Sequence, residues 1–316
     1  MIMRQGIAAL GLCSWDQFIV TETYPGPGEY AIVRQQFEQS GGTTGNACAA
    51  MARLGVPVMF VTAVGDDPHG AALLGDLRHE GCDVSRAIIR TDESSDTGII
   101  VVSGSPAHRD RTIFWIQGAK PQHGDHLPVD EMLDHPWVLL DINDARLRSF
   151  FLDLPAHQSP RTKLFGTMTY LVEMNPADGW HHALRHDVIA GNVRELLTLT
   201  GEPTLDAAFA RAQRDLVANA CNRMFVSHGS NGAYLIQPAG IEHLGAFPVD
   251  VVDTTGAGDA FAAGCLWGLL DRAPNAEIMR RANALGALAC RGLGARSALP
   301  TRDEALAFIA ANGQSQ

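Results

Sequence analysis

The sequence of 316 residues has no excess of positive charge. It carries 24 lysines and arginines against 35 aspartates and glutamates, which gives a formal net charge of −11. Such a balance disfavours binding to nucleic acids and to anionic membrane surfaces, so we expect neither as a partner. The negative net charge still permits a small anionic ligand, because the local electrostatic field of a binding loop can outweigh the field of the whole protein.

Long apolar runs are also missing, and no stretch of the sequence predicts a membrane-spanning helix. Residues 1–12 carry one basic residue and pass directly into an apolar strand, a pattern unlike that of a signal peptide. We therefore expect a cytoplasmic protein that does not insert into membranes.

Cysteine is scarce and scattered along the chain. There is no CxxC pair, and no histidine stands at a spacing typical of a zinc site. We expect reduced thiols in a cytoplasmic core rather than a disulfide framework. The six cysteines are Cys13, Cys48, Cys82, Cys221, Cys265 and Cys290.

Apolar strand-like runs alternate with helix-patterned segments from residue 137 onward. This alternation predicts an α/β fold with three layers, in which helices cover both faces of a mostly parallel sheet. No linker or repeat divides the chain, so residues 1–316 are expected to form a single domain. Ligands of such sheets bind beyond the carboxyl ends of the strands.

Extra strands are expected in the earlier part of the chain. Residues 18–24 and 30–37 alternate polar and apolar side chains around a Pro-Gly-Pro-Gly turn, which is typical of a hairpin. Together with a second pair of strands, they predict a small sheet that stands off the core as a lid. The lid segments are expected at about 18–37 and 98–118.

The most informative motif is DTTGAGD at residues 253–259, between a strand-like run at 247–252 and a helix-patterned run at 260–270. Two glycines allow a sharp turn onto a helix N-terminus, where backbone N–H groups favour an anion. The charge of Asp259 would repel a phosphate if the loop served only to bind it. An acid at this position is expected if Asp259 removes a proton from a hydroxyl while the neighbouring amides hold a phosphoryl group.

This motif differs from two other phosphate-binding loops. The sequence lacks the GK[ST] ending of a P-loop. A dinucleotide-binding fingerprint would have a third glycine where Phe261 stands, and would lie near the start of the chain. The motif therefore favours a kinase that acts on an alcohol.

Other polar positions have two readings when taken alone. Gly41, Gly42 and Asn46 form a glycine turn at a helix start, which is typical of a simple cap. Asp16 reads as a surface acid after the first strand, and Asn192 with Glu195 fits either a cap or a ligand pair on one helix face.

Several of these segments occur in one order along nearly the whole chain: residues 41–46 (GGTTGN), 64–70 (VGDDPHG), the Asn192/Glu195 pair ahead of Thr200-Gly201, residues 253–264, and Gly294-Ala295 ahead of Pro300. As an ordered set they resemble the ribokinase-like (PfkB) family of carbohydrate kinases. The resemblance implies a ribokinase-like fold with a lid. It also implies ATP-dependent phosphorylation of a primary hydroxyl of a small sugar, as in ribokinase or ketohexokinase.

The resemblance also implies roles for individual residues. Asp259 is the general base, and the amides of Gly256, Ala257 and Gly258 form the anion hole. The residues implied to bind the sugar are Asp16, Gly41, Gly42, Asn46 and Asp141. Those implied to bind ATP are Asn192, Ser227, Gly229, Asn231, Gly232 and Asn283.

Metal ions are implied in the same way. Glu195 would hold Mg²⁺ through water, as this ion prefers. Asp253 and Thr255 would help to hold an activating K⁺, although Ala298 stands where relatives often have a hydroxyl. His228 is unusual in its loop, and we expect it to face solvent.

The substrate is open at this point. A nucleoside is one alternative, and a phosphosugar recognised by Arg109 and Arg111 is another, although arginines in a charged loop are more often solvated. A non-catalytic sugar or nucleotide sensor belongs to a different class, and the intact DTTGAGD motif argues against it. The free edges of a lid sheet predict a homodimer that forms through the lid.

Overall fold

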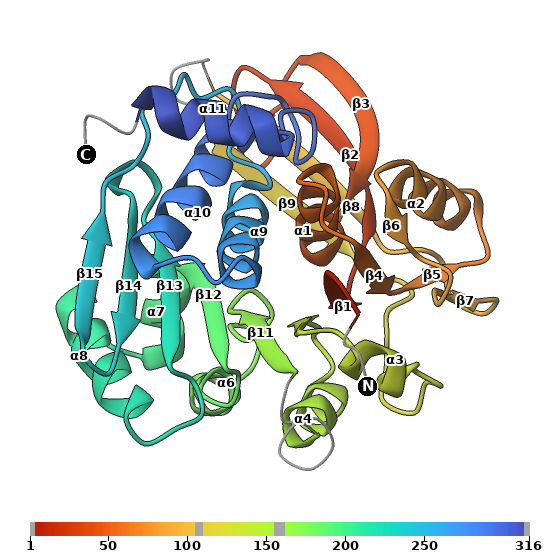
Figure 1. Ribbon diagram of the computed structural model, residues 1–316. Helices are drawn as coiled ribbons and strands as arrows, with labels where there is room; N and C mark the ends of the chain where they lie inside the picture. The colour runs from red at the N-terminus through yellow and green to blue at the C-terminus, as the bar shows by residue number, and fades with distance from the viewer. Residues whose placement is uncertain (1–3, 105–109, 155–161, 313–316) are drawn as a thin grey trace.

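The computed structural model describes residues 4–104, 110–154 and 162–312. The main sheet has nine strands in the order β15-β14-β13-β12-β11-β10-β1-β4-β6 (Figure 1). Neighbours from β13 to β6 are parallel, and β14 is antiparallel to both of its neighbours. The expected mostly parallel sheet is confirmed. Its strands are β1 (Ile7–Gly11), β4 (Val58–Val61), β6 (Cys82–Asp83), β10 (Trp137–Asp141), β11 (Lys163–Thr167), β12 (Val188–Asn192), β13 (Arg223–Ser227), β14 (Ala233–Gln237) and β15 (Gly240–Leu244).

Helices cover both faces of this sheet, as the alternating pattern predicts. Side chains alternate between the two faces of a strand, so Ile7 and Ala9 pack under α1, α9 and α10, whereas Ala8 and Leu10 pack against α3 and α4. Helices α6, α7 and α8 bury the rest of that second face (Figure 1). The helices are α1 (Thr43–Arg53), α2 (Pro68–His79), α3 (Val129–Leu133), α4 (Ala145–Asp153), α6 (Pro176–Ala183), α7 (Val193–Thr200), α8 (Leu205–Leu216), α9 (Ala257–Leu270), α10 (Asn275–Ala289) and α11 (Arg302–Asn312).

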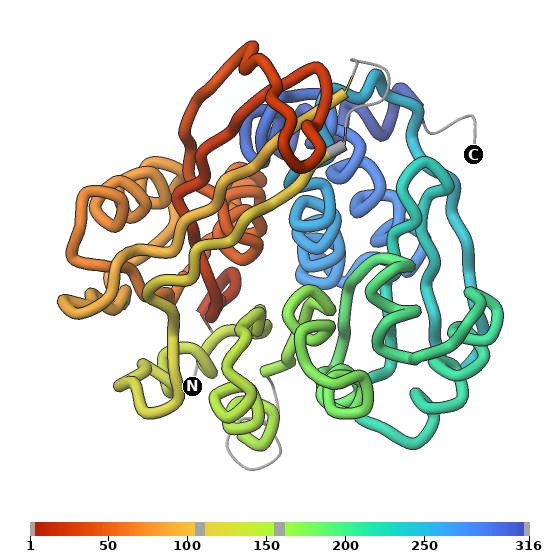
Figure 2. The backbone as a smooth tube through the Cα atoms, turned by 180° about the vertical axis from the view of Figure 1, so that it is seen from behind, coloured from red at the N-terminus to blue at the C-terminus, as the bar shows by residue number. Residues whose placement is uncertain are grey.

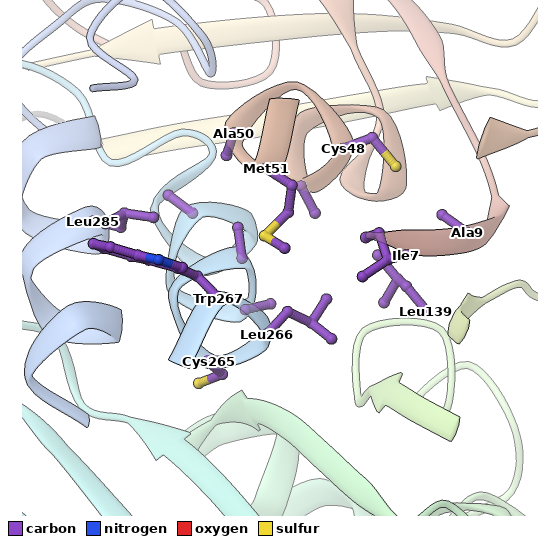
Figure 3. Close-up of a cluster of buried hydrophobic side chains, with 14 of the residues drawn as sticks. Ile7, Ala9, Cys48, Ala50, Met51, Leu139, Cys265, Leu266, Trp267 and Leu285 are labelled. Atoms are coloured by element: carbon purple, nitrogen blue, oxygen red, sulfur yellow. The ribbon is translucent and has the colours of Figure 1, made fainter. Parts of the chain in front are cut away.

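The centre of the core lies between β1, α1 and α9. Figure 3 shows Ile7 of β1, Met51 of α1 and Leu266 and Trp267 of α9 among the side chains gathered there, and all four are at most 1% exposed. Burying one such side chain contributes about 1.5–3 kcal/mol. Helix α9 is apolar on all sides, as is typical of a buried helix, and this packing fixes its first turn relative to the sheet.

Four further strands form a second sheet, which we call the lid sheet, in the order β3-β2-β8-β9. In it β2 (Ser14–Thr21) is antiparallel to β3 (Val33–Gly41) and parallel to β8 (Thr97–Ser103), and β9 (Asp110–Ile116) is antiparallel to β8. Figure 2 shows the red β2 and β3 beside the gold β8 and β9, to one side of the main sheet. Two short strands, β5 (Ala63–Gly65) and β7 (Ile88–Arg90), pair separately.

One expected strand is wrong. Residues 247–252 are not a strand, because the backbone there leaves the sheet and Val252 N donates instead to Cys290 O at the end of α10. Strands β14 and β15 were not expected from the sequence, although they form the hairpin that ends the main sheet. Within the described parts of the chain, no helix is long and apolar enough to cross a membrane.

Candidate active site

Two cavities meet at the N-terminus of α9. One, of about 450 Å³, lies between β13, α10 and the loop that follows β15; we call it the nucleotide-side cavity. The other, of about 470 Å³, lies between the lid sheet and the carboxyl ends of β1, β12 and β13; we call it the lid-side cavity. Both are lined by Ser227, Thr254, Ala257 and Gly258, so they form two halves of one cleft.

The loop between the cavities depends on glycine and on a buried carboxylate. Gly256 has φ +78°, a conformation that favours glycine, and a Cβ there would lie 2.7 Å from Ala295 O. Asp253 accepts hydrogen bonds from Thr255 N (3.0 Å), Thr255 Oγ1 (2.8 Å) and Gly294 N (2.9 Å). The loop is thus held with Gly256, Ala257 and Gly258 on the cavity wall, where the first turn of α9 favours an anion.

Asp259 lies in the first turn of α9 and lines the lid-side cavity. Its Oδ2 accepts a hydrogen bond from Asn46 Nδ2 at 2.8 Å. Burial, opposed by this bond and by Arg111 and reinforced by the charges of Asp141 and Glu195, raises the pKa of Asp259 to about 7. A carboxylate with such a pKa is suited to accept a proton near neutral pH.

Arg296 fixes the amide of Asn46. Its Nε donates to Asn46 Oδ1 at 2.8 Å, and its Nη2 donates to Gly41 O at 2.9 Å. Since a guanidinium can only donate hydrogen bonds, the amide oxygen of Asn46 faces Arg296 and its NH₂ group faces Asp259. The sequence reasoning missed Arg296, which follows the Gly294-Ala295 pair that it had singled out.

The predicted sugar-binding positions Asp16, Gly42 and Asn46 line the lid-side cavity. Asp16 is 6% exposed and accepts a hydrogen bond from Ser14 Oγ at 2.7 Å. Burial raises the pKa of the Asp16 carboxyl to about 6, against the effects of that bond and of the Arg296 charge. A Cβ on Gly41 would overlap the carboxylate of Asp16, so glycine makes room for it.

Asp141 is placed differently. It does not line either cavity, and its carboxylate accepts hydrogen bonds from the hydroxyls of Thr43 (2.6 Å), Thr44 (3.1 Å) and Thr167. At 1% exposure it anchors the start of α1 beneath the cavity floor. Its predicted role as a direct sugar contact is not favoured by this position.

Asn192 and Glu195 form a capping box at the start of α7. Glu195 N donates to Asn192 Oδ1 (3.0 Å), and Asn192 N donates to Glu195 Oε2 (2.9 Å). Both residues also line the lid-side cavity, and their role in ligand binding stays a prediction. Burial, reinforced by Asp141 and opposed by the Asn192 amide, raises the pKa of Glu195 to about 7.

Most of the predicted ATP-binding positions line the nucleotide-side cavity. Asn283 is 7% exposed and donates to Gly245 O (3.0 Å) and to Leu244 O (3.3 Å). Asn231 is exposed and lines neither cavity. The expectation that His228 faces solvent holds in part, because the side chain is half-buried, with its ring 6.0 Å from that of Tyr234. The predicted positions on the cavity wall are Ser227, Gly229, Gly232 and Asn283.

Of the two arginines considered as contacts for a phosphosugar, the structure describes one. Arg109 lies outside the described residues. Arg111 lies on β9, lines the lid-side cavity and donates from Nη1 to Thr254 Oγ1 at 2.6 Å. It therefore stands at the end of that cavity that Thr254 lines, rather than in a solvated loop.

Three lid-side residues were not singled out from the sequence. Asp96, Trp115 and Tyr170 line the lid-side cavity, and Trp115 Nε1 donates to Asp96 Oδ1. Burial, opposed by this bond and by Lys120, raises the pKa of Asp96 to about 7. No local motif marks these residues, because only the pairing of β8 with β9 brings Asp96 and Trp115 together.

The described residues offer few side chains that could bind a metal ion directly. Across residues 4–104, 110–154 and 162–312, no group of three His, Cys, Asp or Glu side chains could hold a metal ion. The Mg²⁺ site near Glu195 therefore stays a prediction. The oxygens of Asp253 already accept hydrogen bonds from Thr255 and Gly294, and the K⁺ site stays a prediction.

Comparison with known proteins agrees with this architecture. The family description "pfkB family carbohydrate kinase" matches residues 4–302. Ribokinase of Haemophilus influenzae is 25% identical over 320 residues, which cover 97% of this chain and 99% of that protein. The ATP-dependent ribose-1-phosphate kinase of Halopiger xanaduensis is 29% identical over 311 residues, with coverage of 96% and 97%.

A solved structure shows the same fold. Arabidopsis thaliana ribokinase, complexed with ribose and ATP, superimposes with a TM-score of 0.81 at 22% identity, covering 97% of this chain and 99% of that one. The large parallel sheet with its smaller companion sheet is therefore a ribokinase-like fold. With the family match across nearly its whole length, the chain belongs to the pfkB family of carbohydrate kinases.

Proposed function

We propose that this protein is an ATP-dependent kinase that phosphorylates a primary hydroxyl of a small sugar, with Asp259 as the general base. The observation that carries the proposal is the position of Asp259. It lies on the wall of the lid-side cavity, one residue after Gly258, where that cavity meets the nucleotide-side cavity. A hydroxyl bound in one half of the cleft thereby meets a phosphoryl donor bound in the other.

In the proposed reaction Asp259 takes the proton of the sugar hydroxyl, and the hydroxyl oxygen attacks the γ-phosphorus of ATP. The bond between that phosphorus and the β,γ-bridging oxygen breaks, so ADP leaves. Amides at Gly256, Ala257 and Gly258 stabilise the charge on the transferred group. Asn46 holds the carboxylate of Asp259 in place.

Mg²⁺ fits this site through Asn192 and Glu195, which offer an amide and a partly buried carboxylate at the cavity wall. When bound, it would neutralise phosphate charge. The nucleotide itself fits the cavity lined by Gly229, Gly232 and Asn283. The lid sheet, which contributes Asp16 and Trp115 to the other cavity, would exclude water from the reacting groups.

A nucleoside is the second candidate substrate. The observation that favours it is a pair of aromatic rings on the cavity wall, Trp115 and Tyr170, whose centroids lie 6.0 Å apart at an angle of 41°. Such a pair could pack against a base. It packs equally well against the C–H face of a sugar, so we place the nucleoside second.

The test is ADP release from MgATP with a panel of pentoses, ketohexoses, their phosphates and nucleosides. We expect one compound to give a strong signal and Asp259→Asn to reduce kcat by about 10²-fold or more, since a general base contributes about 10²–10⁴-fold. Asp250→Asn is the matched control, because Asp250 is exposed and lines neither cavity. Binding of a sugar without ADP release would instead indicate a sensor.

A further inference from the structure

One carboxylate oxygen of Asp96 has no hydrogen-bond partner of good geometry among the described residues, although the neighbouring Thr97 N–H interacts with the carboxyl and lowers its pKa. The residue directly precedes β8, is 1% exposed and lines the lid-side cavity. Trp115 Nε1 donates to its Oδ1, whereas its Oδ2 is buried and has no hydrogen-bond partner among the described residues. A buried polar atom without a partner costs free energy, so its presence on a cavity wall points to a donor on the ligand.

The backbone around Asp96 is held firmly. Asp67, from the VGDDPHG segment, accepts hydrogen bonds from Ser95 N and Ser95 Oγ, both at 2.7 Å. On the other side, Asp96 O accepts a hydrogen bond from Trp15 N at 2.9 Å. With Trp115 fixing one oxygen, the second carboxylate oxygen keeps a defined direction before any ligand arrives.

Charge in the lid-side cavity is unevenly distributed. Among the described residues, the acidic side chains on its wall are Asp16, Asp96, Glu195 and Asp259, and the basic one is Arg111. Arg111 donates to Thr254, so its charge stands at the end of the cavity that Thr254 lines. Lys120 lies over the ring of Trp115, 5.7 Å from the centroid, and does not line the cavity.

We propose that Asp96 is a substrate-specificity residue whose Oδ2 accepts a hydrogen bond from a hydroxyl of an uncharged sugar. Asp16 and Asp96 together disfavour a phosphate or carboxylate on the part of the substrate they face, because such groups bring negative charge and no donor. The inference rests on the proposed function and deepens it by naming the substrate class, a neutral polyhydroxy sugar.

The test compares Asp96→Asn with wild type on neutral sugars and on their phosphates at a pH well above 7, where the Asp96 carboxyl, whose pKa burial raises to about 7, is ionised. We expect KM for the accepted neutral sugar to rise about tenfold with kcat within about twofold, since hydrogen bonds to a charged group are stronger than neutral ones. Relative kcat/KM for the phosphorylated sugar is expected to rise about tenfold, because a repelling charge is removed. Asp92→Asn, a change of the same kind at an exposed position, is expected to alter neither quantity.

Monodeoxy analogues of the accepted sugar locate the contact. For the analogue that lacks the hydroxyl facing Asp96, wild type and Asp96→Asn are expected to have equal KM, because the interaction is absent in both. If Asp96→Asn does not fold, Trp115→Phe provides a second test. It keeps the carboxylate, so it is expected to raise KM for the neutral sugar while preserving discrimination against phosphates.

Three results would overturn the inference while leaving the kinase proposal intact: a wild-type preference for the phosphorylated sugar, an unchanged KM in Asp96→Asn, or an equal loss of kcat on every substrate. If no compound yields ADP, the proposed function fails. Calorimetric titration of wild type and Asp96→Asn with D-ribose, D-fructose and their phosphates then decides the role of Asp96. Weaker binding of the neutral sugar by the variant supports it, and tighter wild-type binding of the phosphates refutes it.

Discussion

At the scale of single residues, ionisation of Asp259 is expected to set the pH dependence of the reaction. Its pKa of about 7 lies above the usual range because the carboxyl is buried. Only the deprotonated form can accept the hydroxyl proton, so kcat/KM is expected to rise with pH through a limb near 7 and then to level off. Since Glu195 also titrates near 7, the measured limb belongs to the coupled carboxylates. A profile that stays flat well below pH 7 would contradict the assignment.

Substitution of Arg296 tests whether this pH dependence belongs to Asp259. The hydrogen bond from Asn46 lowers the pKa of Asp259, and Arg296 holds Asn46 in the orientation that makes the bond. Arg296→Lys removes the planar guanidinium that orients Asn46, so the hydrogen bond to Asp259 is weakened and the pKa of Asp259 rises. The rising limb of kcat/KM is therefore expected to move to higher pH. Arg302→Lys, which changes an exposed arginine paired with Asp271, is expected to leave it in place. An unshifted limb in Arg296→Lys would mean that Arg296 has a purely structural role.

At the scale of elements, the start of α9 makes a prediction about stability. Gly256→Ala would strain a backbone with φ +78° and press Cβ against Ala295, so we expect it to lower the free energy of unfolding by about 2 kcal/mol or more. Gly258→Ala lies two residues on, where a Cβ meets nothing within 4 Å, and is expected to be neutral or stabilising by up to about 1 kcal/mol. Urea unfolding of the two variants measures the contrast. Equal losses would show that the turn does not require glycine.

The elements also show how far sequence reasoning reaches. The continuous apolar run of α9 and the glycine that follows α1, Gly55, are local signals, and the structure agrees with both. The run at 247–252 holds three β-branched valines beside Pro248 and Asp250, and whether such a run joins a sheet depends on a neighbouring strand that the local pattern does not specify. The motif residues Asn46 and Asp259 could be predicted to share a site through the family resemblance. Arg296 and Asp96 could not, because their roles arise from contacts between segments far apart in the sequence.

At the scale of the whole molecule, the outer face of the lid sheet carries exposed apolar side chains along β8 and β9, beyond the part that α2 contacts at β2 and β3. Along β8 and β9, Ile100 and Val102 pack inward, whereas Ile99, Phe114 and Ile116 point to the opposite face. Phe114 and Ile116 are 49% and 53% exposed. An exposed apolar face of this kind marks an interaction site, so we retain the proposal of a homodimer that forms through the lid sheet.

Substitution on that face tests the proposal. We expect wild type to sediment as a dimer and Phe114→Asp to sediment as a monomer, because a charge at the centre of an apolar interface is desolvated without a partner. Val217→Asp is the matched control, since Val217 is 70% exposed at the end of α8, away from the lid sheet. It is expected to leave the dimer intact. A monomeric wild type, or a Phe114→Asp variant that still dimerises, would show that a different surface pairs the chains or that none does. Strand β9 also carries Arg111 and Trp115, which line the cavity, so dimerisation through this face would restrict movement of the lid sheet. The monomeric variant is therefore expected to have a raised KM for the sugar.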